Sequence, residues 1–332
     1  MKKTFSRRLQ DIWYKDPFIG AWLMPLGFVF SDIVRFRRFC YRIGVKKTVK
    51  LKVPVVMVGN LTVGGTGKTP LVIYLAKRLK ASGYRPGIIA RGYGGKAQSW
   101  PLSVTETSNP DVVGDEPLLL AKHSGCPVAV GPKRVESAQL LLDQNACDLI
   151  ISDDGLQHYA LARDIEIVVV DGERWFGNGY CLPAGPLREP SSRLESVDFV
   201  VVNGEKNQAG HFSMQFTGNV AVNLQTGQSK PLAEFIGQPC HAVAGIGNPE
   251  RFFKLLENAG LTPTCHSFPD HYRFAAADLQ FKNNLPVLMT EKDAVKCGGF
   301  DQANLWQVPV QAELEPEFDN RFLELLREKT NG

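Results

Sequence analysis

A glycine-rich stretch ending in Lys-Thr has the residue types and spacing of a phosphate-binding loop. It reads Thr62-Val63-Gly64-Gly65-Thr66-Gly67-Lys68-Thr69, and it separates an apolar run at 53–59 from a helical stretch. Glycines there let backbone N–H groups face a chain of phosphates, and the helix N-terminus adds a positive dipole end. Lys68 is suited to the β- and γ-phosphates, and the Thr69 hydroxyl is suited to Mg²⁺. The stretch predicts a nucleotide-binding P-loop. Its first turn is a variant, because Thr62 stands where the usual pattern has glycine.

Two aspartates follow another apolar run and fit the second half of such a site. The run at 149–152 leads directly into Asp153-Asp154-Gly155. The carboxyl ends of parallel strands meet at the ligand-binding edge of an open α/β sheet. A carboxylate at that edge can hold Mg²⁺ directly or through water. Asp-Asp-Gly is also a favoured turn sequence, so the metal interpretation depends on the P-loop beside it.

Short apolar runs alternate with helical stretches after residue 52. The runs span 53–59, 87–90, 127–130, 149–152, 165–170 and 199–202, and the helical stretches span 68–82, 116–123 and 134–144. Continuous apolar runs are typical of strands that are buried on both faces of a parallel sheet. The alternation predicts an α/β fold with a doubly wound, mostly parallel sheet of the P-loop NTPase kind.

A second, smaller α/β lobe is predicted further along the chain. Residues 211–224 form two alternating segments about Gly218-Asn219, which predicts a hairpin. Strands are expected at 241–244, 287–290 and near 305–308, a helix at 248–259, and a last helix at 317–329 that can dock on the first lobe. The predicted organisation is a membrane-associated helical segment at 1–47, a P-loop domain at 48–205, a hairpin linker at 206–228, the second lobe at 229–312 and a C-terminal helix at 313–332.

The composition is that of an ordinary globular protein, and the cysteine pattern argues against a zinc-binding fold. Hydrophobic residues make up 44% and charged residues 22%, as in ordinary globular proteins. The seven cysteines are scattered singly, without a Cys-x-x-Cys pair or a histidine cluster at metal-ligand spacing. This pattern indicates reduced thiols and argues against a structural zinc site.

Positive charge in residues 1–47 lies on both sides of an apolar stretch at 17–30. This stretch is shorter than the roughly 20 residues that span a bilayer, and Gly20, Pro25 and Gly27 interrupt it. A signal peptide fits poorly, because no small-residue cleavage site follows. Beyond it, apolar residues at 33, 36, 39, 40 and 43 recur at helical spacing between arginines. The pattern favours a helix lying in the headgroup region of an anionic membrane over a helix packed on the protein's own core.

Several motifs together resemble those of the tetraacyldisaccharide 4′-kinases, the lipid A 4′-kinases of Gram-negative bacteria. In the first lobe they are GNLTVGGTGKTP at 59–70, RGYGG at 91–95, VGDEP at 113–117, DDGLQH at 153–158 and LPAGPLREP at 182–190. In the second lobe they are FPDHY at 268–272 and TEKDAVK at 290–296. The resemblance runs from the basic N-terminus to about Lys296. Thr62 belongs to that family's pattern, which accounts for the departure from the usual P-loop.

The resemblance implies an ATP-dependent lipid-sugar kinase that uses Mg²⁺. Such an enzyme moves the γ-phosphate of ATP to the 4′-hydroxyl of a tetraacylated glucosamine disaccharide 1-phosphate, a step of lipid A biosynthesis. It would act as a peripheral protein at the cytoplasmic face of the inner membrane. No nucleic acid and no obligate protein partner is indicated.

The resemblance also implies residue roles. The Asp and His that act together in deprotonating the hydroxyl fall on Asp115 and His271, and Lys68 is the third catalytic residue. The expected metal residues are Thr69, Asp153, Asp154 and Glu189. Positions associated with phosphate or substrate contacts are those of Tyr93, Arg134, Gln157 and Arg188.

Structural roles remain open for several of these residues when the resemblance is set aside. Asp115 begins a helix and also fits an N-cap. His271 lies in a polar loop and also fits a surface residue. Arg134 fits a helix cap, Tyr93 fits a turn aromatic, and the loop at 182–190 fits a plain connector.

An alternative function is a membrane-associated switch ATPase of the partition or positioning type. Those proteins also combine a Gly-Gly-x-Gly-Lys-Thr loop with an amphipathic helix. They carry a signature Lys where this chain has Val63, and their P-loop lies nearer the N-terminus. A GTPase would need an Asn/Thr-Lys-x-Asp guanine motif. The candidate sequences at 203–206 and 290–293 both have the Lys displaced.

Overall fold

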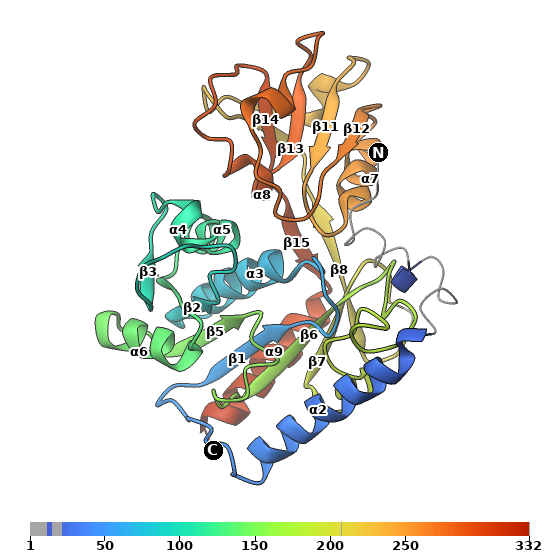
Figure 1. The fold of residues 1–332 in the computed structure, drawn as a ribbon. Coiled ribbons are helices and arrows are strands. Elements are labelled where there is room, and N and C mark those ends of the chain that lie inside the picture. The colour runs from blue at the N-terminus through green and yellow to red at the C-terminus, as the bar shows by residue number, and fades with distance from the viewer. Residues whose placement is uncertain (1–11, 15–21, 207, 332) are drawn as a thin grey trace.

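The chain forms two α/β lobes, and two strands cross between them (Figure 1). The computed structural model describes residues 12–14, 22–206 and 208–331. Most of the predicted membrane segment before residue 22, with its basic residues Lys2, Lys3, Arg7 and Arg8, lies outside the described residues.

The larger sheet has nine strands and carries the P-loop at its centre. Its order is β15 (Gln311–Leu314), β8 (His211–Thr217), β7 (Phe199–Asn203), β6 (Ile165–Asp171), β1 (Val55–Gly59), β5 (Leu149–Asp153), β2 (Pro86–Ala90), β4 (Val128–Val130) and β3 (Leu102–Val104). The outermost strands β15 and β3 are antiparallel to their neighbours, and the inner strands are parallel. The prediction of a doubly wound, mostly parallel sheet is confirmed.

Successive residues of each strand point to opposite sides of the sheet, so both faces carry apolar side chains. Helices and loops cover both of these faces. On one face, Val56 and Val58 of β1 pack in a core with α3 (Lys68–Ala81), α5 (Asp115–Ser124) and α9 (Pro316–Asn331). On the other face, Val55 and Met57 pack with α6 (Arg134–Gln144). The C-terminal helix α9 inserts Phe318, Phe322 and Leu326 into the first-lobe core, which confirms that it docks there.

The second sheet has six strands in the order β10 (Ser229–Pro231), β9 (Val220–Asn223), β14 (Leu305–Val308), β13 (Val287–Thr290), β11 (His241–Ala244) and β12 (Thr264–Ser267). The α-helices of the second lobe are α7 (Pro249–Asn258) and α8 (Glu291–Ala294). The short helix α4 (Pro110–Val113) belongs to the first lobe. Short 3₁₀ helices span Ser191–Ser196, Leu232–Phe235 and Ala276–Leu279. Strands β11, β12 and β13 are parallel, so the loops that follow them emerge at one edge of the sheet. That edge faces the first lobe (Figure 1).

The predicted hairpin about Gly218-Asn219 is wrong. Strand β8 pairs with β7 and β15 in the first sheet, whereas β9 pairs with β10 and β14 in the second. Neither Gly218 nor Asn219 has the positive φ that a type I′ turn requires. The chain passes from one lobe to the other here, and it returns between β14 and β15. The alternating pattern identified two strands correctly, but their partners lie far away in the sequence.

Helix α2 (Met24–Arg42) lies along the first lobe (Figure 1). Most of its large apolar side chains are exposed. Its buried residues are the small ones Gly27, Ser31 and Cys40, and a Cβ added at Gly27 would lie 2.9 Å from the Ala184 Cβ. Between 53% and 68% of Ile33, Phe36, Phe39 and Ile43 is exposed. This is the reverse of a helix that packs its apolar face on the core. Among the described residues, no helix has both the length and the apolar character needed to cross a membrane.

Candidate functional site

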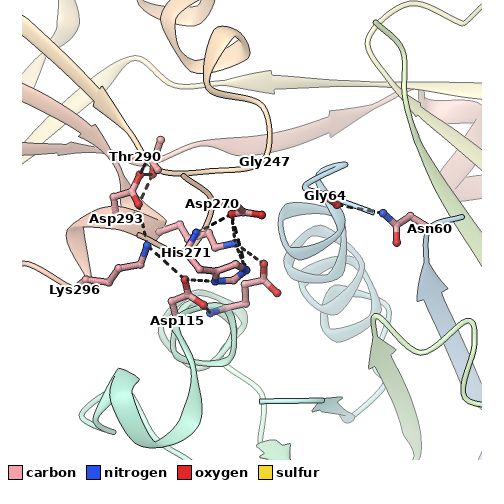
Figure 2. A network of polar contacts seen from close by, with 12 residues as sticks. Asn60, Gly64, Asp115, Gly247, Asp270, His271, Thr290, Asp293 and Lys296 are labelled. Carbon is pink, nitrogen blue, oxygen red and sulfur yellow. Dashed lines mark hydrogen bonds and ion pairs between the residues drawn. The ribbon is translucent and has the colours of Figure 1, made fainter. Parts of the chain in front are cut away.

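The P-loop leaves the end of β1 and curls into the first turn of α3. Gly64 and Gly67 have φ values of 104° and 98°, which L-residues with side chains rarely adopt. The Asn203 side-chain amide donates to the Thr66 carbonyl at 2.9 Å, and the Asn60 amide donates to the Gly64 carbonyl at 3.3 Å (Figure 2). These contacts hold the loop open around the α3 N-terminus, where backbone N–H groups can bind an anion.

The departure at Thr62 has a structural explanation. Thr62 is buried and forms an isolated antiparallel bridge with Leu187, Val63 N donates to the Pro186 carbonyl at 2.9 Å, and Arg188 N donates to the Leu61 carbonyl at 2.6 Å. Because Thr62 is paired like a strand residue, it needs no glycine conformation. The loop at 182–190 is therefore a support for the P-loop and not a plain connector.

The predicted strand-end acids lie beside the P-loop because β5 neighbours β1, with Asp153 opposite Val58. Asp154 is 3.4 Å from the Lys68 Nζ and accepts from the Arg188 guanidinium at 3.0 Å and 3.1 Å. Burial opposes ionisation of Asp154, but the Lys68 and Arg188 charges outweigh it and lower the pKa of this carboxyl well below its usual range. The structure thus brings Lys68, Asp154 and Arg188 into contact with one another beside the P-loop.

Two other carboxylates nearby are almost fully buried. Burial, followed by the neighbouring Glu116 carboxylate, raises the pKa of Asp153 well above its usual range. Asp153 Oδ1 has no hydrogen-bond partner among the described residues, and the same holds for Glu189 Oε1. The other Glu189 oxygen accepts from the Tyr159 hydroxyl at 2.6 Å. A buried carboxylate oxygen without a donor is costly unless the carboxyl group is protonated or a cation is bound to it.

Arg134 lies beneath the two aspartates and contacts backbone. Its guanidinium donates to the carbonyls of Gly131 at 2.9 Å, Asp153 at 3.2 Å and Asp154 at 3.4 Å, and only 2% of the residue is exposed. Because the acceptors are main-chain oxygens, Arg134 stabilises the position of the C-terminal end of β5.

Replacing Arg134 with methionine should lower the free energy of unfolding by about 2–4 kcal/mol, because charge-assisted bonds to buried carbonyls are lost. ATP binding should also weaken as the β5 end loosens. Urea unfolding and nucleotide titration measure the two effects. Lys133→Met is the matched control, since Lys133 is exposed and pairs only with Glu136 on the surface. Unchanged stability of Arg134→Met would contradict this supporting role.

Asp115 and His271, from different lobes, meet in the structure. Nδ1 of His271 is 3.1 Å from Oδ2 of Asp115, and the Lys296 Nζ is 3.7 Å from the same oxygen (Figure 2). Burial alone would raise the pKa of Asp115, but the His271 hydrogen bond and the charges of Lys292 and Lys296 lower it from 3.8 to about 2. Asp115 is therefore an ionised carboxylate oriented toward an imidazole. It makes no side-chain cap to its helix beyond a 3.0 Å contact with the N–H of Glu116.

Two open cavities are lined by residues of both lobes. One of about 510 Å³ is lined by Lys68 and Thr69 on the first lobe and by Gly247 and Lys292 on the second, a volume typical of small-ligand sites. The second, of about 320 Å³, is lined by Asp115 and His271 together with Tyr93, Arg273 and Lys296. Gly247 approaches the P-loop so closely that a Cβ on it would lie 2.4 Å from the Gly65 nitrogen. The second lobe thus closes directly over the phosphate-binding loop.

The remaining predicted residues take different positions. The exposed Tyr93 ring lies 5.0 Å from the His271 ring, and the Gln157 amide donates to the Asn60 carbonyl at 3.1 Å behind the P-loop. Sequence reasoning missed Glu116, Lys292 and Asn203. Glu116 and Lys292 lie inside motifs that were recognised, but nothing local assigned them a role. The one feature of the sequence that could have indicated a role for Asn203 was its position at the end of a predicted strand.

Comparisons with known proteins identify the family of this chain. The family model described as "Tetraacyldisaccharide-1-P 4'-kinase" matches residues 19–327. The tetraacyldisaccharide 4′-kinase of Nitrosococcus oceani is 51% identical over 325 residues, covering 98% of this chain and 96% of its own. That of Methylobacillus flagellatus is also 51% identical, covering 97% of each.

A solved structure is similar over nearly the whole chain. The crystal structure of the "apo" form LpxK from Aquifex aeolicus in complex with ATP superposes with a TM-score of 0.76 at 30% identity, covering 93% of this chain and 100% of that one. With a P-loop, strand-end acids and a cross-lobe Asp–His pair in place, and with relatives aligned from end to end, this chain belongs to the tetraacyldisaccharide 4′-kinase family.

Proposed function

We propose that the protein transfers the γ-phosphate of ATP to the 4′-hydroxyl of a tetraacylated glucosamine disaccharide 1-phosphate, a step of lipid A biosynthesis. The observation that carries the proposal is the 3.1 Å contact of Asp115 with His271 beside the P-loop cleft, because a proton acceptor next to a phosphate site suits transfer to an alcohol. The relatives named as tetraacyldisaccharide 4′-kinases supply the identity of the acceptor.

The two cavities suggest how the substrates are arranged. The triphosphate would lie along residues 62–69, with the nucleoside in the larger cavity and Lys68 on the β- and γ-phosphates. The sugar would enter the smaller cavity, where Tyr93 offers an aromatic face and Arg273 and Lys296 offer charge. Asp115 and His271 would take the hydroxyl proton as the new P–O bond forms, and Arg188 would steady the transferred phosphoryl group.

The oxygen atoms at the end of β5 and in the P-loop are of the kind that Mg²⁺ prefers, but among the described residues no three acidic, histidine or cysteine side chains converge on one point. Asp153 Oδ1 and Glu189 Oε1 are buried oxygens without a donor among the described residues, and Thr69 is the hydroxyl at the expected P-loop position. We propose that Thr69, Asp153, Asp154 and Glu189 hold the ion directly or through water, in the manner of hard oxygen ligands. When bound, Mg²⁺ neutralises phosphate charge as it is redistributed in the transition state.

A switch ATPase is disfavoured by family membership and by Val63 at the position of that class's signature lysine. The deciding experiment supplies γ-labelled ATP, Mg²⁺ and a detergent-dispersed tetraacylated disaccharide 1-phosphate to the purified protein. We expect label to appear in the lipid and the acceptor mass to rise by one phosphate. Release of free phosphate alone would refute the kinase proposal.

We further propose that α2 places the protein on the cytoplasmic face of the inner membrane as a peripheral protein. Support comes from its exposed apolar face and from the arginines at 35, 37, 38 and 42 along the same helix.

Changing both Ile33 and Phe36 to glutamate should reduce binding to anionic vesicles at least about tenfold, because two apolar anchors are lost. Vesicle sedimentation measures this. Ile236→Glu is the control, since Ile236 is an exposed apolar residue of the second lobe at 50% exposure. Equal sedimentation of the double variant and the wild type would contradict the α2 anchor.

A further inference from the structure

Lys292 contacts His271 on the side of the ring opposite Asp115. Its Nζ is 3.4 Å from His271 Nε2, 3.6 Å from Asp270 Oδ1 and 2.8 Å from Glu116 Oε1. Only 15% of the lysine side chain is exposed. One ammonium therefore joins α5 of the first lobe to the His271 loop of the second.

The hydrogen-bond chemistry of these groups determines how the imidazole is arranged. An ammonium has three donors and no acceptor, so its contact with Nε2 requires the lone pair of that nitrogen. The ring N–H is then on Nδ1, which faces Asp115 Oδ2 at 3.1 Å. Burial would lower the pKa of Lys292, but the carboxylates of Glu116, Asp270 and Asp115 outweigh it and raise the pKa. Lys292 is therefore a permanent cation.

Lys292 projects from a rigid support. Thr290 caps α8 by accepting from Asp293 N at 3.2 Å, and Asp293 Oδ2 accepts from Thr290 at 2.7 Å and from Gly245 N at 2.8 Å (Figure 2). His271, in contrast, lies in a loop with a left-handed φ of 57°. A side chain on such a loop needs external contacts to keep one orientation.

We propose that Lys292 is a positioning residue that holds His271 with its Nδ1–H on Asp115, places its ammonium beside Nε2, and through Glu116 ties this arrangement to the closed lobes. The inference rests on the proposed kinase function, since it leaves the Asp115 carboxylate, oriented by the His271 N–H, as the group that accepts the hydroxyl proton. The groups that face His271 are Asp115, Asp270, Lys292 and the Tyr93 ring, with Lys296 acting through Asp115.

The test compares Lys292→Met and Lys292→Arg in the full-length protein, with phosphate transfer to the dispersed acceptor measured against pH. Lys292→Met should lower kcat by about 10- to 100-fold, because the base pair is misplaced, with the KM for MgATP changed less than about threefold. The acid limb of its rate profile should move to higher pH, because no cation opposes protonation of Nε2. Lys292→Arg keeps the charge, so its acid limb should stay at the wild-type position.

Lys254→Met is the matched control. Lys254 and Glu173 also form a lysine–glutamate pair between the lobes, at 2.5 Å, but on the exposed surface. Neither its kcat nor its acid limb should change appreciably.

The possible outcomes distinguish a failure of this inference from a failure of the proposed kinase function. Absence of transfer by the wild type would refute the kinase proposal and this inference together. With wild-type transfer present, an unmoved acid limb in Lys292→Met would refute the positioning role alone. A raised KM for MgATP with unchanged kcat would refute it too, by making Lys292 a nucleotide ligand. If Lys292→Met shows no cooperative thermal unfolding, Lys292→Gln replaces it, with the same shift expected and the same refutation.

Discussion

Replacing Lys68 with alanine is expected to lower kcat/KM for phosphate transfer by about 10³-fold or more, because a cation aimed at the transferred group is lost. Lys68 is the first residue of α3, and only 10% of its side chain is exposed. Its Nζ is 3.4 Å from Asp154. A bound triphosphate would offer it the β- and γ-oxygens, where negative charge is redistributed during transfer.

Transfer of label from ATP to the lipid measures this effect, and thermal unfolding verifies that the variant is folded. Lys80→Ala is the control on the same helix, because Lys80 is exposed and donates to the Gly125 carbonyl at 2.6 Å. It should retain nearly full activity. Near-normal transfer by folded Lys68→Ala would show that residues 62–69 do not hold the reacting triphosphate.

Replacing Asp115 with asparagine should lower kcat by about 10²- to 10⁴-fold, the usual contribution of a positioned base. Asparagine preserves the shape and the contact with His271, but it cannot take a proton. Because a base acts in the transition state, KM for the acceptor should change little. A defect confined to KM would make Asp115 a binding residue.

A double-mutant cycle tests whether Asp115 and His271 work as one unit. His271→Gln alone should also lower kcat strongly, and the double variant should lose little beyond Asp115→Asn. Nucleotide binding by both single variants should stay close to wild type. Fully additive losses would show that the 3.1 Å contact has no part in the reaction.

Much of the first lobe could be predicted from the sequence, because its signals are local. The buried strands of β1, β5, β6 and β7 are continuous apolar runs, and the P-loop lies between a strand and the helix that it opens. Asp153 follows its strand directly, so parallel pairing of β5 with β1 brings it to the P-loop. Such features depend on residues adjacent in the chain.

Errors arose where the partner of a segment was not its neighbour. The hairpin about Gly218-Asn219 was wrong because β8 and β9 pair with β15 and β14, about 90 residues further on. The contacts of Arg134 with the main-chain carbonyls of Gly131, Asp153 and Asp154 were also not predicted, whereas its expected role at phosphate or substrate stays a prediction. Nothing in the sequence near Arg134 specifies those acceptors.

By itself the sequence determined the phosphate-binding loop, the parallel sheet around it and, through its motifs, the family. Only the tertiary structure decided that Asp115 meets His271 across 156 residues, that Lys292 contacts the other ring nitrogen of that imidazole, and that α2 turns its small residues inward. The physical reason is that backbone conformation and strand burial follow from near neighbours. A contact between lobes depends instead on the path of the whole chain, which is the outcome of all its packing at once.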